Sequence, residues 1–455
     1  MGVLENTPML EVPEPRRSQV GHVLICAGQA QARAPTDGAS LIEIGSVLEF
    51  GRGSVDGALP RLQTDDPRMS RTHAIIRSLD GKTALVRDLD SRNGTFIDGE
   101  LLNDEQPLRD GAVIFMGAHV FVYRLMSRAD LAAIAADLSH PLGPVPTHSA
   151  VMARLAGRLR KLARWNVDLL LGGETGVGKE VLAEAIHRES GRSGPFVAIN
   201  CAALPDTLIE SELFGYARGA HSMAQHGKPG LIEGAENGTL FLDEIGDMPH
   251  NAQSKLLRFL QDRQLLSLGT TRLRKLNVRV VAATHREITC RDDLQGLRLD
   301  LAARLGPEPL VIPPLRDRPE DIGLLVSHFL RDRPRAFDIR AYRALFLRKW
   351  PGNVRELEKA VQLAGILSES HDSIEIGDLP SDPGQTIDQE ATDDRRLPSE
   401  RPTPLELVAL LERHRGNVGR VARELGRQRT LVWRWLRKDG LKPAAYRDGG
   451  LDRQN

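Results

Sequence analysis

The stretch that most constrains this chain is residues 171–180, LGGETGVGKE. It carries the pattern G-x-x-x-x-G-K between Gly173 and Lys179. The glycines let the backbone turn successive N–H groups toward phosphate oxygens, and the lysine supplies a positive charge for the β- and γ-phosphates. An apolar run at 167–171 predicts a buried strand before the loop, and residues 181–187 predict a helix after it. Strand, loop and helix in this order predict a loop that binds the phosphates of a nucleotide.

A second stretch, residues 238–248 with the sequence GTLFLDEIGDM, completes the expected nucleotide site. Its apolar run at 239–242 predicts a short strand that ends in Asp243 and Glu244. A carboxylate at a strand end can hold Mg²⁺ through water, and its neighbour can orient the attacking water. We therefore expect ATP and Mg²⁺ as cofactors, with Asp243 at the metal ion and Glu244 at the water. The loop residues expected at the nucleotide are Gly173, Glu174, Thr175, Gly176, Val177, Gly178, Lys179 and Glu180.

Composition and charge limit the classes of protein to which this chain can belong. Its 455 residues fit about three domains. Basic and acidic residues are balanced at 61 each, so no overall attraction to nucleic acid or to a membrane surface is implied. No apolar run reaches the roughly 18 residues of a membrane helix. The three cysteines, Cys26, Cys201 and Cys290, are far apart and show no metal-binding spacing. These features predict a cytoplasmic protein with no membrane partner.

The N-terminal part of the chain alternates short strand-forming runs with turn residues, which predicts a β-sandwich. Three of its loops carry the sequences GR, SRTH and SRNGT. This order resembles the forkhead-associated (FHA) domain, a family that binds phosphothreonine peptides. The resemblance implies that Arg52, Ser70 and Arg71 contact the phosphate, that Asn93 holds the peptide backbone, and that His73 ties the loops together. Arginine, hydroxyl and amide donors suit the charge and acceptor oxygens of phosphothreonine. The alternative is a sandwich that serves only to dock subunits in a ring.

From about residue 149 to residue 378 the chain carries a series of motifs: GETGVGKE, FVAINCAAL, ESELFGYARGA, GTLFLDEIGDM, VRVVAATHREI, LRLDLAARL, PPLRDRPEDI and WPGNVRELE. The series resembles the AAA+ ATPase domain of sigma-54-dependent transcription activators. That family also carries glutamate at the position of Glu180. The resemblance implies an α/β core, a helical lid and a homo-oligomeric ring that hydrolyses ATP.

The same resemblance implies roles for residues outside the two nucleotide motifs. A guanidinium stabilises the charge that spreads over the γ-phosphate, and its supply by a neighbouring subunit requires a ring. The implied roles are Asn200 as the link between Glu244 and nucleotide state, Thr284 and His285 as the first sensor, Arg298 and Arg304 as fingers toward a neighbour's ATP, and Arg355 as the second sensor.

One loop departs from the family pattern. Sigma-54 activators contact the sigma factor with a loop that reads GAFTGA, whereas this chain reads GAHSMA at 219–224. An aromatic residue is replaced by histidine, and a glycine that can take positive φ is replaced by methionine. The length is kept, so we expect a projecting loop with altered tip chemistry. Its residues are Gly219, Ala220, His221, Ser222, Met223 and Ala224.

Two functions of different class follow from these features. In the first, which family membership favours, the chain remodels sigma-54 RNA polymerase and tolerates the altered loop. In the second, it is a DNA-bound ATPase that acts on another client or represses. A third possibility, a phosphopeptide adaptor with a vestigial motor, is opposed by the presence of Lys179, Asp243, Glu244, Arg298 and Arg304.

Residues 401–455 are basic, with thirteen Lys or Arg against six Asp or Glu. Apolar spacing and glycine breaks predict three helices, at 403–414, 418–425 and 429–438, in helix-turn-helix order. The stretches GNVGRVARELG and RQRTLVWRWLRKDGL resemble the Fis-type DNA-binding domain of this family, which implies an upstream DNA partner. Val432 and Leu436 are expected to face the core, Arg429, Thr430, Trp433 and Arg434 are expected to face DNA, and a dimer or core contact is the alternative for Trp433.

The whole chain is therefore expected to be a multidomain transcription regulator under the control of a phosphothreonine protein or a Ser/Thr kinase. Its fold class is an all-β FHA sandwich, an α/β AAA+ P-loop domain with a helical lid, and an all-α helix-turn-helix. The expected boundaries are a tail at 1–20, the FHA sandwich at 21–126, a connector at 127–148, the ATPase core at 149–314, the lid at 315–378, a linker at 379–402, the helix-turn-helix at 403–442 and a tail at 443–455.

Overall fold

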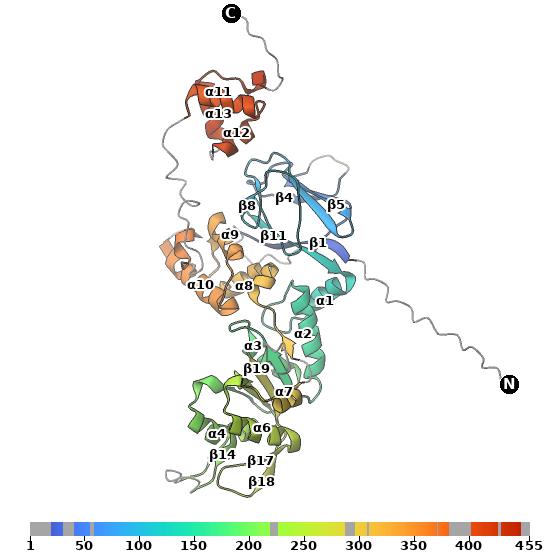
Figure 1. The fold of residues 1–455 in the computed structure, drawn as a ribbon, viewed down its shortest axis with the longest axis vertical. Coiled ribbons are helices and arrows are strands. Elements are labelled where there is room, and N and C mark those ends of the chain that lie inside the picture. Colours follow the sequence, from blue (N-terminus) through green and yellow to red (C-terminus); the bar gives the residue numbers. More distant parts are fainter. Residues whose placement is uncertain are drawn as a thin grey trace, which may run out of the picture.

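The computed structural model describes residues 20–30, 41–54, 59–218, 226–286, 296–306, 309–370, 372–381, 402–425 and 429–446. Figure 1 shows an N-terminal β-sandwich, a central α/β core with a helical lid, and a group of short C-terminal helices. The expected fold class is confirmed: all-β, then α/β with a lid, then all-α. Among the described residues, the helices are all too short or too polar to cross a membrane.

The N-terminal sandwich consists of two facing sheets with strand orders β2-β1-β11-β10-β7-β8 and β4-β3-β5-β6-β9. Alternate residues of both sheets, such as Leu24, Ile76 and Phe121, are buried together in its core. The expected β-sandwich is therefore present. Its strands are β1 (Val20–Gln29), β2 (Leu41–Ile44), β3 (Val47–Arg52), β4 (Arg61–Thr64), β5 (Ala74–Asp80), β6 (Thr83–Asp88), β7 (Thr95–Ile97), β8 (Glu100–Leu101), β9 (Gln106–Pro107), β10 (Val113–Met116) and β11 (His119–Ser127).

Two helices connect the sandwich to the central part: α1 (Arg128–Ser139) and α2 (Ala150–Ala163). Ser127 begins α1 with a capping box, in which its hydroxyl accepts from the Asp130 N–H and the Asp130 carboxylate accepts from the Ser127 N–H. The connector expected at 127–148 therefore begins with a helix.

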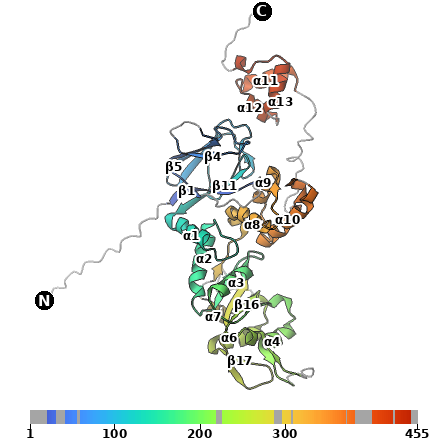
Figure 2. The same cartoon turned by 180° about the vertical axis from the view of Figure 1, so that it is seen from behind.

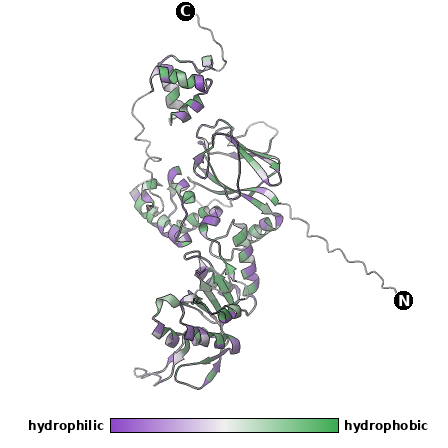
Figure 3. Cartoon of the chain, in the orientation of Figure 1, coloured by the Kyte–Doolittle hydropathy of each residue, from purple (hydrophilic) through white to green (hydrophobic). Residues whose placement is uncertain are grey.

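The α/β core is built on a parallel sheet with the strand order β13-β16-β19-β12-β20. Its inner strands are apolar along nearly their whole length (Figure 3), because helices cover both faces of a parallel sheet. The strands are β12 (Leu169–Gly172), β13 (Phe196–Asn200), β16 (Thr239–Asp243), β19 (Arg279–Thr284) and β20 (Leu310–Val311), and the helices that follow α2 are α3 (Lys179–Glu189), α4 (Asp206–Phe214), α5 (Leu231–Gly234), α6 (His250–Asp262) and α7 (Leu299–Leu305).

Two short hairpins extend the core away from the lid, at the lower end of the molecule in Figure 1. The first pairs β14 (Gly215–Tyr216) with β15 (Lys228–Pro229), and the second pairs β17 (Gln264–Leu266) with β18 (Leu273–Lys275). The N–H of Ala217 donates to the carbonyl of Leu268 over 2.8 Å and joins the two hairpins.

The lid packs around Trp350, whose indole N–H donates to the carbonyl of Leu345 over 2.7 Å. Its two short strands pair in parallel. The lid elements are the 3-10 turns Leu315–Asp317 and Pro319–Asp321, then α8 (Ile322–Phe329), β21 (Ala336–Phe337), α9 (Ile339–Leu347), α10 (Asn353–Leu367) and β22 (Ser373–Ile374).

The C-terminal part contains α11 (Pro404–Arg413), α12 (Val418–Glu424) and α13 (Arg429–Lys438). These bounds match the three predicted helices to within one residue at each end. Val432 and Leu436 are fully buried in the core of the three helices, as expected. The side chain of Trp433 is 41% exposed, which is contrary to the alternative that it is a core residue.

Arg279 stabilises the joint between α2 and the sheet. This arginine is 1% exposed, and its guanidinium donates to the carbonyls of Leu162, Ala163 and Val167 over 2.9–3.2 Å. Arg279→Ala should lower the free energy of unfolding by about 3 kcal/mol, because one buried and two partly buried carbonyls lose their donor. Urea unfolding of the full chain measures this. The surface variant Arg274→Ala is the control, and an equal loss in both variants would contradict the assignment.

Candidate active site

The phosphate-binding loop follows β12 and ends at the first turn of α3. Gly173, Gly176 and Gly178 have φ values of 144°, 81° and 103°, which favour glycine. A Cβ at Gly176 would overlap the carbonyl oxygen of Gly352 in the lid, so the glycine is also needed for close packing. The loop therefore has the positive-φ turns that the sequence pattern required, and its conformation depends on contact with the lid.

Lys179 lies at the centre of the site and is only 6% exposed. Its ammonium donates to the carbonyls of Gly173 at 2.8 Å and Glu174 at 3.3 Å, and it lies 3.7 Å from a carboxylate oxygen of Glu244. Burial lowers the pKa of Lys179, and the negative charges of Glu244 and Asp243 oppose that shift. The loop and the acidic strand end, which are 64 residues apart from Lys179 to Asp243, therefore meet around one cation.

The two carboxylates after β16 differ in their surroundings. Burial, followed by the charge of Glu244, raises the pKa of Asp243. Glu244 has a left-handed backbone, with φ 51° and ψ 51°. Its carboxylate accepts from the backbone N–H of His285 at 3.1 Å and lies 2.5 Å from the His285 Nδ1. Strained backbone of this kind persists where the surrounding contacts hold it, and here the end of β19 supplies them.

Two other predicted residues lie at strand ends beside this pair. Asn200 pairs in register with Asp243, and its side-chain oxygen accepts from the N–H of Ala202 at 2.9 Å. Thr284 ends β19, is buried, and accepts from the N–H of Arg286 at 3.2 Å. In this structure the described partners of the Glu244 carboxylate are His285 and Lys179, so a link from Asn200 to Glu244 stays a prediction.

The lid holds the phosphate-binding loop through a clasp that the sequence did not reveal. Asn353 is fully buried and has a backbone φ of 54°. Its side-chain amide donates to the carbonyl of Thr175 and to the carboxylate of Glu174, at 3.0 Å each. Its oxygen accepts from the N–H of Leu315 at 2.8 Å. Arg316 makes two hydrogen bonds with the Glu174 carboxylate, at 2.6 and 2.8 Å. These contacts join core and lid directly at the loop.

The predicted second sensor, Arg355, belongs to the same region of the lid. Its backbone N–H donates to the carbonyl of Gly176 at 3.2 Å, and its charge contributes to lowering the pKa of Lys179. The structure therefore places Arg355 on the nucleotide side of α10. The sequence motif around it, WPGNVRELE, also contains Asn353 directly after Gly352, and this was the signal that the sequence interpretation overlooked.

The two predicted fingers lie at opposite ends of α7. Arg298 is the N-cap residue directly before the helix, pairs with Asp300 at 2.8 Å and donates to the hydroxyl of Ser254. Arg304 lies in the last turn and donates to the carbonyl of Leu260 at 2.8 Å. Both arginines are thus held against α6 of their own subunit. Their action on a neighbouring subunit stays a prediction.

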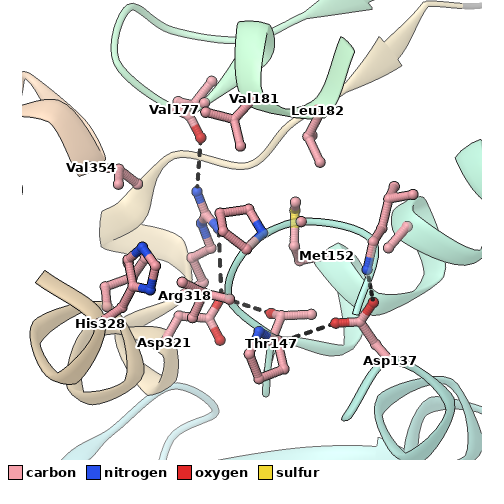
Figure 4. Close-up of a pocket in the computed structure, with 18 of the residues that line it drawn as sticks. Asp137, Thr147, Met152, Val177, Val181, Leu182, Arg318, Asp321, His328 and Val354 are labelled. Carbon is pink, nitrogen blue, oxygen red and sulfur yellow. Dashed lines mark hydrogen bonds and ion pairs between the residues drawn. The ribbon is translucent and has the colours of Figure 1, made fainter. Parts of the chain in front are cut away.

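An apolar cavity of about 230 Å³ adjoins the loop. Figure 4 shows Val177, Val181, Leu182 and Met152 around it, with Thr147 and Asp321 on the opposite side. Such a cavity, apolar with a few polar groups, suits a flat heteroaromatic ring such as a nucleobase. The cavity lies between the connector, the start of α3 and the lid.

The residues around Asp243 fit a magnesium ion of the kind used with nucleotides. Mg²⁺ keeps several waters and takes one or two carboxylates plus substrate phosphates. The described residues contain no group of three or more His, Cys, Asp or Glu that could hold a metal without such help. A single carboxylate at the end of β16, beside the phosphate-binding loop, matches this requirement.

The FHA loops that carry the expected peptide contacts are joined to one another by hydrogen bonds. The N–H of Arg52 donates to the carbonyl of Ser70, and the amide of Asn93 donates to the carbonyl of Arg68 at 2.6 Å. Arg52, Arg71 and Asn93 are exposed, and the Ser70 hydroxyl accepts from the N–H of Arg92. His73 is fully buried between the Ser70 N–H and the Gly94 carbonyl, which is the structural role expected for it.

Two predicted sites fall wholly or partly outside the described residues. The GAHSMA loop, residues 219–224, lies beyond the described ends of the β14–β15 hairpin. In α13 the side chains of Arg429, Thr430 and Arg434 are not described, whereas Trp433 is exposed as a DNA contact would require. These assignments stay predictions.

Replacement of the buried amide in the clasp tests its role. Asn353→Asp keeps the shape and the tolerance for positive φ but removes the N–H donor and places a negative charge against Glu174. We expect weaker ADP binding, seen as a smaller ADP-induced rise in melting temperature, because the lid no longer holds the loop. Gln362→Glu, on the exposed face of α10, is the matched control. An ADP-induced rise equal to that of the unmodified chain would contradict the clasp.

Comparison with known proteins agrees with this geometry. Residues 145–310 match the sigma-54 interaction domain, residues 48–117 match the FHA domain, and residues 316–396 match an AAA+ ATPase lid domain. The chain is 42% identical over 317 residues to the transcriptional regulatory protein GlrR of Escherichia coli K12, which covers 67% of this chain and 70% of that protein.

Two further relatives show the same pattern. The regulatory protein AtoC of E. coli K12 is 39% identical over 318 residues, 66% of this chain and 69% of that protein. The transcriptional regulatory protein XylR of Pseudomonas putida is 44% identical over 261 residues, 56% of this chain and 45% of that protein. Taken with the nucleotide site and the sandwich, these matches show that the chain belongs to the family of sigma-54-dependent transcriptional regulators and carries an AAA+ ATPase domain and an FHA domain.

Proposed function

We propose that this protein binds an upstream DNA site, hydrolyses ATP in a homo-oligomeric ring, and remodels sigma-54 RNA polymerase under the control of phosphothreonine. The observation that carries the proposal is the meeting of Lys179, Asp243 and Glu244 in one partly buried site that the lid closes. A lysine for the phosphates and carboxylates for a metal ion and for the attacking water are present there.

In this proposal the chain's own residues each have a defined part in hydrolysis. The nucleobase enters the apolar cavity and the loop N–H groups hold the phosphates. Lys179 leaves the loop carbonyls and neutralises the β- and γ-phosphates. Asp243 would hold Mg²⁺, which supplies charge neutralisation at the phosphates when bound. Glu244, held by His285, orients the attacking water and accepts its proton.

The ring supplies the remaining positive charge. Arg298 and Arg304 lie at the two ends of α7, and in a ring they would turn from α6 toward the ATP of the adjacent subunit. The charge on the γ-phosphate oxygens in the transition state is stabilised by guanidinium groups. Hydrolysis would then depend on assembly, so that a signal which controls assembly also controls activity.

A second function is favoured by one specific observation, the sequence GAHSMA in the client loop. The β14–β15 hairpin flanks this stretch of the chain, in which the aromatic residue and the second glycine of the family pattern are replaced. In the alternative, the ATPase works on another client or the protein represses. The helix-turn-helix and the FHA loops would keep the same roles in both cases.

The role of Glu244 is tested by a substitution that keeps its shape. Glu244→Gln should still bind ATP but lose roughly 10²–10⁴-fold in turnover, because the amide cannot accept the proton of the attacking water. Steady-state phosphate release and equilibrium ATP binding measure the two effects separately. Lys179→Ala is the comparison and should lose ATP binding itself. Turnover in Glu244→Gln near that of the unmodified chain would show that another group activates water.

The client is tested with the purified chain trapped in ADP and a metal fluoride, which mimics the phosphoryl group in transfer. Co-elution with sigma-54 on a sizing column is the expected result. A chain that hydrolyses ATP but forms no trapped complex would contradict the sigma-54 client and favour the alternative. Lys179→Ala, which should not enter the trapped state, is the negative control.

A further inference from the structure

The FHA sandwich and the ATPase lid share one hydrophobic core. Ala27, Phe115 and Val122 of the sandwich pack with lid residues that include Ile322 and Tyr342. In both views β1 and β11 form the side of the sandwich that faces α1 and α8 (Figure 1 and Figure 2). The contact is thus continuous and apolar rather than a loose encounter of two surfaces.

The backbones of the two domains approach closely at a glycine. Gly323 lies in α8 and is buried, and a Cβ at this position would overlap the carbonyl oxygen of Ala27 in β1. A glycine inside a helix costs stability relative to alanine, so its presence here is explained by the space that the FHA backbone needs. The N–H of Phe337 also donates to the carbonyl of Ala30 at 2.7 Å.

A buried ion pair adds specificity to this contact. Arg124 on β11 donates to the carboxylate of Glu320 at 2.7 Å and to the carbonyl of Asp317 at 2.7 Å. The side chain of Glu320 is almost fully buried. Because an unpaired buried charge is costly, this pair fixes which surfaces of the two domains meet.

The same FHA sheet also touches the ATPase core. Val23, Ile25 and Met126 pack with Ile134 of α1 and Ala153 of α2. The sandwich therefore contacts both sides of the nucleotide cleft, the lid through α8 and the core through α2.

The connector joins α1, which packs on the sandwich, to the apolar cavity beside the phosphate-binding loop. The Thr147 hydroxyl donates to Asp321 of the lid at 2.7 Å, and the Thr147 N–H donates to Asp137 of α1 at 3.1 Å. Thr147, Asp137 and Asp321 all line the cavity and are labelled in Figure 4. A shift of the lid relative to α1 would change the shape of that cavity.

The lid also reaches the phosphopeptide end of the sandwich. Arg343 on α9 donates to the carbonyl of Gly117, in the turn between β10 and β11, at 3.2 Å. Its guanidinium lies over the rings of Phe96 and Phe115, 4.6 and 5.4 Å from their centres. Arg343 is therefore an integral contact of the docked state.

From that turn, hydrogen bonds continue to a predicted peptide contact. The N–H of Ala118 donates to one oxygen of Asp66 at 2.7 Å, and the N–H of Arg68 donates to the other at 2.9 Å. The carbonyl of Arg68 accepts from the side chain of Asn93. A contiguous chain of contacts thus joins the lid to the loops expected to hold phosphothreonine.

We propose that the docked FHA domain is a brace that positions the lid over the nucleotide cleft, so that undocking it weakens nucleotide binding. Through Arg343, the same contact connects the phosphopeptide loops to the ATPase site. The inference rests on the proposed nucleotide function and extends it to the FHA domain. It assigns to the sandwich an intramolecular partner, the α8–α9 face of the lid.

The test adds one methyl group at the closest approach of the two domains. Gly323→Ala in the full chain should speed hydrogen–deuterium exchange in both β1 and α8, while β5 and β6 on the far sheet keep their protection. The affinity for a fluorescent ADP analogue should fall by about fivefold or more, within the usual range of coupling between sites. Gly157→Ala is the matched control, because an added Cβ in α2 meets no atom within 4 Å.

A second variant distinguishes loss of the interface from misfolding of the lid. Arg343→Ala removes the α9 contact without inserting an atom, and it should shift exchange and ADP affinity in the same direction. Arg333→Ala, an exposed arginine of the lid, is its control.

Three outcomes are distinguishable. Faster exchange with weaker ADP binding supports the brace. Unchanged exchange, or undocking with ADP affinity equal to that of the unmodified chain, overturns it. An unmodified chain that fails to bind the ADP analogue overturns the proposed nucleotide function itself, and with it the brace.

Discussion

The side-chain amide of Asn353 bonds to the phosphate-binding loop through its N–H groups and to the lid backbone through its oxygen. The residue is buried with positive φ, a combination that asparagine tolerates better than most other residues. Because the loop is fixed in this way, Lys179 lies between the loop carbonyls and Glu244. The geometry around Lys179 and Glu244 therefore depends on the lid as much as on the sheet.

The nucleotide site lies between the core and the lid, so a movement of one relative to the other changes the site. Core and lid meet at the loop, at the apolar cavity and at the connector, and the FHA sandwich packs on both. The interface between sandwich and lid combines apolar burial with one buried ion pair, which sets the orientation of the two domains. In this arrangement a signal at the sandwich need not travel through flexible chain to reach the ATPase, because the two domains already share a core.

The sequence predicted local features well and long-range contacts poorly. The loop from Gly173 to Lys179, the strand ending in Asp243 and the three C-terminal helices have local signatures, namely glycine spacing, apolar runs and helix breaks. The pairing of Asn353 with Thr175, or of Arg124 with Glu320, joins residues more than 170 positions apart and leaves no periodic pattern. The sequence likewise did not predict the contact between His285 and Glu244, because the two residues belong to different motifs.

One measurement tests the central claim, that the ATP site is completed by a neighbouring subunit in a ring. Lys179→Ala and Arg298→Ala subunits, each inactive alone, are mixed in equal amounts and their ATPase activity is measured. A Lys179→Ala subunit can still offer Arg298 to the ATP held by an Arg298→Ala neighbour. In a head-to-tail ring each ATP site meets one neighbour. With equal random mixing, about half of the sites keep Lys179 and about half of their neighbours keep Arg298, so about a quarter of the interfaces are complete. Recovery near that level is the predicted result, and a mixture no more active than its components would contradict the account.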